Sequence, residues 1–585
     1  MLGPQGWIAL LRIVVGAWFL KAVWTKLTLA SVWGIPYPAV SPRFVAFQPK
    51  RVAEFAAGTT VAWYKDFLEH TVLGNSALFA QLQTYGEVAV GVGLIPYFRM
   101  HQTPPDEFPR HERELGAGPD DRSRFGSVSM RARHLLGVAI LGGLLLACAR
   151  VGDGRVGARV PIDHIVVLFL ENRSFDHLFG TYPGAEGLAF YHGRQADKTA
   201  VTYATLPAPL GRDGKPDPRF PGDLPNAPFA MRRFVGPFDQ TNNPVHRFYH
   251  MQRQYGAGAD GVPMGRWVAE GTSAGATMGY YEKTALPVQW RLAEQFVLLD
   301  RYFAGIHGGS LANHFYLISA TLATYPDAPE ELRAQLAPDG SVLRDGDVDP
   351  EGHVVNNLDP PYPPQRVPRI LRVPQTAPTI ADRLDGAGVS WRWYATGWGA
   401  GADAVKQGLV PHHNPFQYVK RIMENREGRA HIQDASAFVR ALRDGGLPSV
   451  AFVKPHAIKN AHPVSSTVGA GDRWIGKMVG EIMASRYWPR VAVVITYDEG
   501  GGWFDHVRPP VVDRFGLGTR VPTLVISPYA KRGVVAHGEY DHASILKFIE
   551  WRFGLPPLTE RDRRAAAFLE AFDFEQAPRP PIALP

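Results

Sequence analysis

Strand-like apolar runs that alternate with helical stretches constrain the fold of this chain most strongly. Six runs rich in β-branched and aromatic residues read IDHIVVLFL, FVLLD, VSWRWYA, PSVAFVKP, RVAVVITYDE and VPTLVISPY. Helix-like stretches such as TIADRLDGAG, DASAFVRALRDGG and DRWIGKMVGEIMASR lie between them. Such alternation predicts an α/β fold with a mainly parallel central sheet and helices on both faces.

The composition excludes several other classes of protein. The chain has 585 residues, 45% of them hydrophobic, which suffices for a large core. Its 60 glycines and 50 prolines predict many turns and long ordered loops. The net charge of +7 comes from scattered Lys and Arg residues that form no nucleic-acid-binding arm, so no nucleic-acid partner is expected. The single cysteine excludes an intramolecular disulfide and a thiolate zinc cluster.

Acidic and amide side chains follow two of the apolar runs directly. Glu171 and Asn172 come after the first run, in ENRSFD, and Asp498 and Glu499 end the fifth, in TYDEGGGWFDH. Functional groups gather at the carboxyl ends of parallel strands, and neighbouring carboxylates repel each other unless a cation or a proton intervenes. These oxygen donors suit a hard divalent cation such as Ca²⁺, Mg²⁺ or Mn²⁺. The alternative is a helix-capping cluster with a β-bulge.

Two serines are candidate nucleophiles. Ser310 follows Gly-Gly and precedes the helical stretch NHFYLISATL, where it is either a simple helix cap or a metal-activated phosphoryl acceptor. Ser273 lies in GTSAG, which matches the G-x-S-x-G pattern of hydrolases. No strand precedes GTSAG, so this segment is predicted to be a loop.

The first 148 residues have a different character. Apolar stretches at 7–24 and 78–98 predict a helical membrane hairpin within residues 1–100, which resembles a fragment of DoxX-type membrane proteins. A charged linker at 101–129 leads to MRARHLLGVAILGGLLLAC at 130–148, which is similar to a bacterial lipoprotein signal ending at Cys148. The alternative is a short hydrophobic helix with a buried cysteine. A linker followed by a fresh Met and a signal indicates two joined reading frames, in nature or in the gene model.

The region from 161 to 567 resembles the phosphoesterase family of non-specific phospholipases C and an acid phosphatase, within the alkaline-phosphatase-like superfamily. The matching motifs include ENRSFDHLFG, DRYF…GGSLAN, HHNPF, ITYDEGGGWFDHVRPP, RVPTLVISPYAKRG and YDHASILKFIE, in the family's order. The resemblance implies a catalytic domain over 159–575. His314 stands where the family usually has Arg, and the C-terminal β-domains of large bacterial members are missing.

The resemblance also implies roles for individual residues. The metal ligands would be Glu171, Asn172, Asp498 and Glu499. Ser310 would be the nucleophile, with histidines around the phosphate at His246, His462 and His506. The implied reaction is a metal-dependent hydrolysis of phosphate esters through a phosphoseryl intermediate, of the phospholipase C or acid phosphatase type.

Two other functions stay open at this point, a non-catalytic surface lipoprotein of the same fold and a membrane redox accessory protein acting through the N-terminal segment. The signal-like segment predicts a protein of the bacterial cell envelope, membrane-anchored with its catalytic domain outside the cytoplasm. The expected partner is a phospholipid or another phosphate ester. The sequence does not decide between a phospholipid, a monoester and a diester, and it leaves the oligomeric state open.

Overall fold

The computed structural model describes residues 27–32, 35–40, 52, 65, 160–362 and 369–585. The chain falls into two units, Met1–Leu141 and Gly142–Pro585. In the first unit, β1 (Leu27–Val32) and β2 (Ile35–Val40) pair in antiparallel fashion. The predicted apolar stretches at 7–24 and 78–98, the linker and the signal-like segment lie outside the described residues. Within the described ranges, no helix is both long and apolar enough to cross a bilayer.

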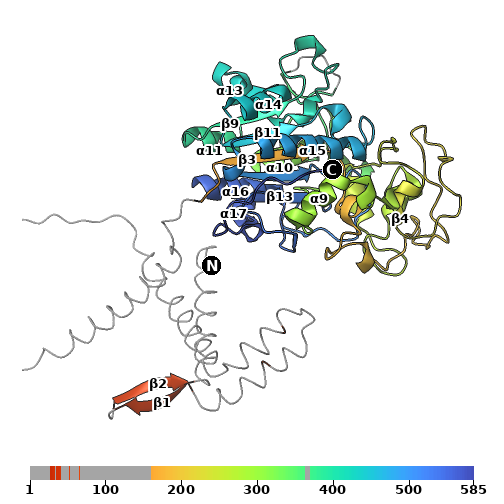
Figure 1. The fold of residues 1–585 in the computed structure, drawn as a ribbon. Helices are drawn as coiled ribbons and strands as arrows, with labels where there is room; N and C mark the ends of the chain where they lie inside the picture. Colours follow the sequence, from red (N-terminus) through yellow and green to blue (C-terminus); the bar gives the residue numbers. More distant parts are fainter. Residues whose placement is uncertain (1–26, 33–34, 41–51, 53–64, 66–159, 363–368) are drawn as a thin grey trace, which may run out of the picture. The chain divides into compact units, whose positions relative to one another are not determined.

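An eight-stranded sheet forms the centre of the second unit (Figure 1). The first five strands in its order pair in parallel, β13 runs antiparallel to both of its neighbours, and β14 is parallel to β6. All six apolar runs belong to this sheet, so the mainly parallel sheet is confirmed. Its order is β10 (Ile432–Gln433), β9 (Trp391–Ala395), β11 (Val450–Lys454), β3 (His164–Leu170), β12 (Val491–Tyr497), β13 (Thr523–Ile526), β6 (Val297–Leu299) and β14 (Val534–Ala536).

Helices cover the sheet in two groups (Figure 1). Every residue of β11 and β12 is buried, which requires cover on both faces because successive side chains point to opposite sides. Helices within a group contact one another. One group is α9 (Pro287–Gln295), α14 (Ala435–Asp444) and α15 (Val468–Ala484), and the other is α10 (Ser310–Ser319), α11 (Ile380–Gly386) and α16 (His542–Phe553).

Local sequence signals set the ends of these helices. α11 and α16 both begin with a capping box, in which the N-cap and N3 side chains bond to each other's backbone N–H groups. The Thr467 side chain accepts the Ala470 N–H at the start of α15. α16 ends at Gly554, whose left-handed conformation with φ 66° suits glycine. The helices predicted at 379–388, 434–446 and 472–486 correspond to α11, α14 and α15.

Short elements fill the long connections between the strands of the sheet. Residues 171–296 alone separate β3 from β6, as the glycine and proline content led us to expect. The helices are α6 (Phe175–Phe179), α7 (Phe248–Gln254), α8 (Trp267–Glu270), α12 (Lys420–Met423), α13 (Arg426–Ala430) and α17 (Glu560–Arg564). The small strand pairs are β4 (Phe229–Ala230) with β5 (Gly279–Tyr280), and β7 (Gln335–Leu336) with β8 (Val342–Arg344).

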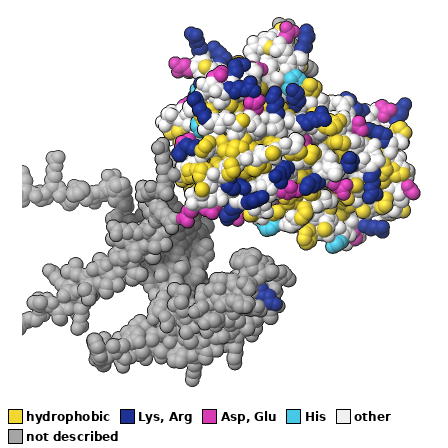
Figure 2. All heavy atoms as spheres, in the orientation of Figure 1, with side chains coloured by type: hydrophobic (Ala, Val, Ile, Leu, Met, Phe, Trp, Pro, Cys, Tyr) yellow, Lys and Arg dark blue, Asp and Glu magenta, His cyan; other side chains and the backbone are white. Residues whose placement is uncertain are grey.

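The surface of the second unit carries mixed charges. On the face drawn in Figure 2, Lys and Arg side chains lie among acidic and hydrophobic ones and form no continuous band. This face therefore presents no uniform positive field to a polyanion.

Candidate active site

The carboxyl ends of β3 and β12 bring together the four residues predicted as metal ligands. The two strands are parallel neighbours, with Leu170 opposite Tyr497, so the residues that follow leave the sheet side by side. All four side chains are fully buried: Glu171, Asn172, Asp498 and Glu499. Burial of so many oxygen atoms at one point requires a compensating cation, protons or hydrogen-bond donors.

Asn172 joins the two strand ends. Its backbone N–H donates to Asp498 Oδ1 at 2.8 Å, and its side-chain Nδ2 donates to Glu499 Oε1 at 3.1 Å. Asn172 adopts the left-handed region, with φ 57°, which Asn tolerates better than most residues. The ENRSFD segment therefore turns inward at once, and Ser174 then caps α6 by accepting the His177 N–H.

The glycines after Asp498 and Glu499 allow neighbouring backbone segments to pack closely against this turn. Gly501 and Gly502 have φ values of 64° and 73°. A Cβ atom on Gly501 would lie 2.5 Å from the Asn172 carbonyl oxygen, and one on Gly502 would lie 2.4 Å from the Val245 carbonyl oxygen. Glycine is required at both positions because the backbone loops that carry Asn172 and His246 approach so closely.

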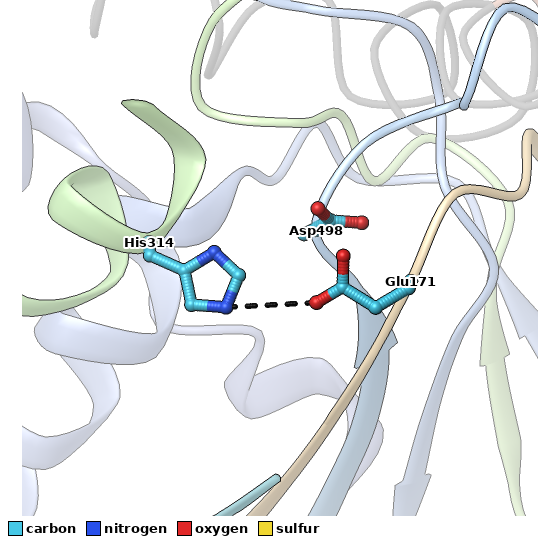
Figure 3. A group of neighbouring side chains, drawn as sticks. All are labelled: Glu171, His314 and Asp498. Atoms are coloured by element: carbon cyan, nitrogen blue, oxygen red, sulfur yellow. Dashed lines mark ion pairs between the residues drawn. The ribbon is translucent and has the colours of Figure 1, made fainter. Parts of the chain in front are cut away.

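Two histidines and a lysine that were not among the predicted site residues surround Glu171. His314 of α10 places Nε2 3.6 Å from Glu171 Oε1 (Figure 3), and His413 places Nε2 3.2 Å from Glu171 Oε2. Their rings stack with centroids 5.3 Å apart. Lys454, the last residue of β11, is buried and contacts Glu171 Oε1 through its ammonium group. The sequence did carry one signal for Lys454, a charge that closes an apolar run.

Burial controls the protonation of this group. It raises the pKa of Glu171 well above its usual range, and the nearby Asp498 charge raises it further. Burial and Asp498 likewise raise the pKa of Glu499. Burial lowers the pKa of His314 and His413 well below the ordinary value, and the positive charge of Lys454 adds to this effect. Both imidazoles are therefore neutral at pH 7 and able to act as ligands.

The residues at the strand ends fit a divalent cation. Glu171, His314 and Asp498 each offer one ligand atom, and these atoms all lie within 4.8 Å of one another. Asn172 Oδ1 and Asp498 Oδ2 are buried without a hydrogen-bond partner among the described residues. Oxygen and imidazole donors at this spacing match the ligand preferences of divalent cations. Glu499 instead accepts the Gly501 N–H at 2.7 Å and the Asn172 amide.

Ser310 lies at the start of the helix that supplies His314. It is the first residue of α10, after the N-cap Gly309, and it is buried. His314 Nδ1 lies 2.6 Å from the Ser310 carbonyl oxygen, which orients Nε2 toward Glu171. The other candidate, Ser273, lies between α8 and a short 3-10 helix (Ala274–Met278), so the loop predicted for GTSAG is present.

Of the three predicted histidines, His246 and His462 lie together. His246 Nε2 is 3.2 Å from Asn172 Nδ2 and 3.8 Å from Glu499 Oε1. The His462 ring lies 6.0 Å from the His246 ring. Burial lowers the pKa of both histidines, so both are neutral at pH 7.

His506 belongs to a second buried cluster of charged groups. Its Nδ1 lies 2.6 Å from Asp176 Oδ2, and Arg520 donates to Asp176 Oδ1 at 3.0 Å and to Asp505 Oδ1 at 2.8 Å. Burial alone would lower the pKa of His506, but the Asp176 carboxylate outweighs it and the pKa is raised. The His506 ring thus contacts Asp176 in the helix that follows Asn172. A catalytic role for His506 stays a prediction.

The chain is similar to known proteins over most of its length. The model of the Phosphoesterase family matches residues 162–556. Phospholipase C B of Mycobacterium tuberculosis is 28% identical over 469 residues, covering 72% of this chain and 80% of that protein. Non-specific phospholipase C6 of Arabidopsis thaliana is 26% identical over 518 residues, covering 80% of this chain and 82% of that protein. Non-hemolytic phospholipase C of Pseudomonas aeruginosa is 25% identical over 467 residues, covering 72% of this chain and 58% of that protein.

Similarity to solved structures is weaker. A protein in the alkaline phosphatase superfamily from Vibrio parahaemolyticus has 12% sequence identity and a TM-score of 0.25, covering 46% of this chain and 60% of that one. A score of that size carries no weight beside the sequence match over residues 162–556. That match spans more than half of the chain, which belongs to the phosphoesterase family and is a hydrolase that acts on phosphoric ester bonds.

Proposed function

We propose that this hydrolase cleaves phospholipids or related phosphate esters in a metal-dependent reaction through a phosphoseryl intermediate on Ser310. One observation carries the proposal: Asn172 and Asp498, which follow the neighbouring strands β3 and β12, each have a buried oxygen atom without a hydrogen-bond partner, and Glu171 beside them contacts the helix that begins with Ser310. A divalent cation bound there supplies Lewis-acid chemistry, polarising a phosphate oxygen and lowering the pKa of a neighbouring hydroxyl.

The protein contributes binding and orientation to this reaction. Glu171, Asp498 and His314 would hold the cation, and Asn172 would add its free Oδ1. Ser310 lies in the first turn of α10, where the helix dipole favours the negative charge of a phosphate and of the serine oxygen. The Ser310 hydroxyl would release its proton to solvent, and Oγ would form the new bond to phosphorus while the bond from phosphorus to the alcohol oxygen breaks.

Hydrogen bonds assign different proton roles to the two neighbouring histidines. His246 Nδ1 lies 2.7 Å from the Pro244 carbonyl oxygen and so carries the proton, which leaves Nε2 as an acceptor. His462 Nδ1 accepts the Val464 N–H at 3.2 Å, so its Nε2 carries the proton. His462 Nε2–H would therefore donate a hydrogen bond to the departing oxygen, which takes its proton from solvent. His246 Nε2 accepts the Asn172 amide N–H and orients that side chain. In the second step a water molecule forms a bond to phosphorus as the bond from Ser310 Oγ to phosphorus breaks, and a proton of that water returns to Ser310 Oγ.

An assay of the full chain tests the proposal. Hydrolysis of p-nitrophenylphosphorylcholine and p-nitrophenyl phosphate should stop in EDTA and return when Ca²⁺, Mg²⁺ or Mn²⁺ is added. The variant Ser310→Ala should lose at least about 10³-fold in kcat, because a nucleophile cannot be replaced by its neighbours. Ser273→Ala is the matched control and should keep near wild-type turnover. A chelator-insensitive activity, or equal losses in the two variants, would contradict the proposal.

The substrate and the cellular location extend the proposal. The names of the relatives favour a phospholipid over a soluble monoester, and comparing the two nitrophenyl substrates separates a diesterase from a monoesterase. The signal-like segment at 130–148 supports a cell-envelope enzyme anchored through Cys148. Mass spectrometry of the exported protein should find a lipid on Cys148, and an unmodified thiol there would refute the anchor.

The N-terminal 129 residues are tested separately. If they come from a second reading frame, a chain that starts at Met130 should be exported and active. A chain starting there that fails to fold, while the full chain folds, would show that the N-terminal segment is integral to the enzyme.

A further inference from the structure

A cavity of about 340 Å³ opens beside the candidate active site. His246 and Gly309 form part of its wall. His246 contacts Asn172 at the strand ends, and Gly309 is the N-cap directly before Ser310. The cavity therefore begins where the phosphate of a bound ester would lie, and its volume accommodates the group esterified to that phosphate.

Two arginines give this cavity its chemistry. Arg247 and Arg369 both line it, together with the polar side chains of Thr272 and Asn357. Arg247 contacts Asp345 through Nε and donates from Nη1 to Asp347 Oδ1 at 3.0 Å, and Arg369 also contacts Asp347.

The acidic partners of the two arginines do not line the cavity. The Asp347 side chain is 3% exposed, whereas that of Arg369 is 51% exposed. Neither Asp347 nor Asp345 belongs to the cavity lining. The guanidinium groups are thus held by Asp345 and Asp347, and they contribute N–H donors to the cavity lining.

The lining is unsuited to a quaternary ammonium group. No Phe, Tyr or Trp side chain belongs to the lining of this cavity, which lies wholly within the described residues. Quaternary ammonium groups are recognised by aromatic faces, and two guanidinium groups would repel such a cation. Hydroxyl groups, in contrast, can accept hydrogen bonds from Arg and exchange them with Thr and Asn side chains.

We propose that this cavity selects a polyol headgroup, of the glycerol or inositol kind, and disfavours choline. The proposal rests on the proposed function and adds the class of substrate. Arg247 and Arg369 are the specificity-determining residues. Replacing either one loses hydrogen bonds to the polyol and leaves Asp347 with less positive charge around it, which is more favourable to a cationic headgroup.

The test compares short-chain phosphatidylglycerol, phosphatidylinositol and phosphatidylcholine as substrates of the full chain. The wild type should show a kcat/KM ratio of at least about tenfold in favour of a polyol lipid over the choline lipid, the effect of one charge-assisted hydrogen bond. Arg247→Gln and Arg369→Gln should each reduce that ratio about fivefold or more. Arg253→Gln is the matched control, since Arg253 pairs with Glu270 at 3.0 Å with similar exposure but does not line the cavity, and the ratio should stay unchanged.

A binding measurement separates this inference from the proposed function. Calorimetry should show tighter binding of glycerol phosphate than of phosphocholine, whether or not the protein is catalytically active. Hydrolysis of the choline lipid at a rate equal to or higher than that of the polyol lipids, or tighter binding of phosphocholine, would overturn the headgroup inference. The proposed phosphoesterase activity would still stand in that case. If no phosphate ester is hydrolysed, the proposed function fails, and the two binding constants alone then decide on the cavity. Thermal unfolding of each variant verifies that it is folded, and the wild-type ratio decides the question even if a variant is not.

Discussion

Replacing Asp498 by asparagine removes one negative charge from the buried strand ends while it preserves the shape of the side chain. Asp498 Oδ1 accepts the Asn172 N–H at 2.8 Å, and the Asn Oδ1 can accept the same bond. Asp498 Oδ2 has no hydrogen-bond partner among the described residues, so the variant breaks no existing bond there. The loss therefore falls on cation binding and hardly on packing.

The magnitude follows from the geometry of the site. Unit charges about 4 Å apart interact by about 4 kcal/mol at an effective dielectric constant of about 20. A divalent cation loses at least that much when one carboxylate ligand becomes neutral, which corresponds to about a 1,000-fold weaker affinity. Without metal the effect has the opposite sign. Asp498 raises the pKa of both Glu171 and Glu499, so its removal relieves repulsion and should leave the free energy of unfolding equal or higher.

Calorimetric titration of the chelator-stripped protein with Mn²⁺ or Ca²⁺ measures the first quantity, and urea unfolding in EDTA measures the second. Asp505→Asn is the control, because Asp505 is equally buried but bonds to Arg520 in the other cluster. That variant should lose stability and keep its metal affinity. The electrostatic reasoning is refuted if Asp498→Asn binds the cation within about threefold of the wild type, or loses more than about 2 kcal/mol of stability in EDTA.

Three further changes probe the surroundings of the site. Lys454→Met removes the ammonium group that pairs with the buried Glu171 and should reduce the free energy of unfolding in EDTA by roughly 3 kcal/mol. In a double-mutant cycle measured by urea unfolding, adding Glu171→Gln to this variant should restore most of that loss. Additive losses would show that the two side chains do not interact. Gly501→Ala should weaken metal binding and reduce the melting temperature, because its Cβ would lie 2.5 Å from the Asn172 carbonyl oxygen. Gly214→Ala is the control, since Gly214 also has a positive φ, 74°, but has open space around it. This control should show only the loss of stability that comes from backbone strain. Burial raises the pKa of Asp472 to about 6, above its unfolded value. The stability that it contributes is therefore full below the unfolded pKa, at about pH 3, and is lost as pH rises through about 6 to about 7. Against Asp472→Asn in EDTA, the wild type should lose up to about 3 kcal/mol between about pH 3 and about pH 7, and parallel stability curves would disprove the shift.

The sheet could be predicted from sequence because its strands are apolar on both faces. Each of the six runs can be recognised as an apolar segment that polar residues bound, as Arg490 and Asp498 bound VAVVITY. The reversed direction of β13 could not be predicted, since TLVI has the same apolar pattern in a parallel or an antiparallel strand. The two-residue strand β10 is too short to carry any pattern.

The strand pattern alone could predict the part of the site whose residues directly follow strands. Glu171 and Asp498 stand at two neighbouring strand ends, so their proximity follows from the parallel sheet. His314 and His413 reach Glu171 from α10 and from a 3-10 helix (Pro411–His413), and only the tertiary arrangement of these helices decides that they meet. The spacing of residues in the sequence therefore cannot predict which side chains of the covering helices reach the site.

The hydrogen bond from the Asn172 N–H to Asp498 joins residues that are 326 positions apart. At about 5 to 20 residues per second, the ribosome needs on the order of tens of seconds to reach Asp498 after it has made Asn172. For that time the newly made β3 has no β12 beside it, and its apolar edge is open to other chains. A growing chain therefore cannot assemble a cation site at these strand ends until β12 is made.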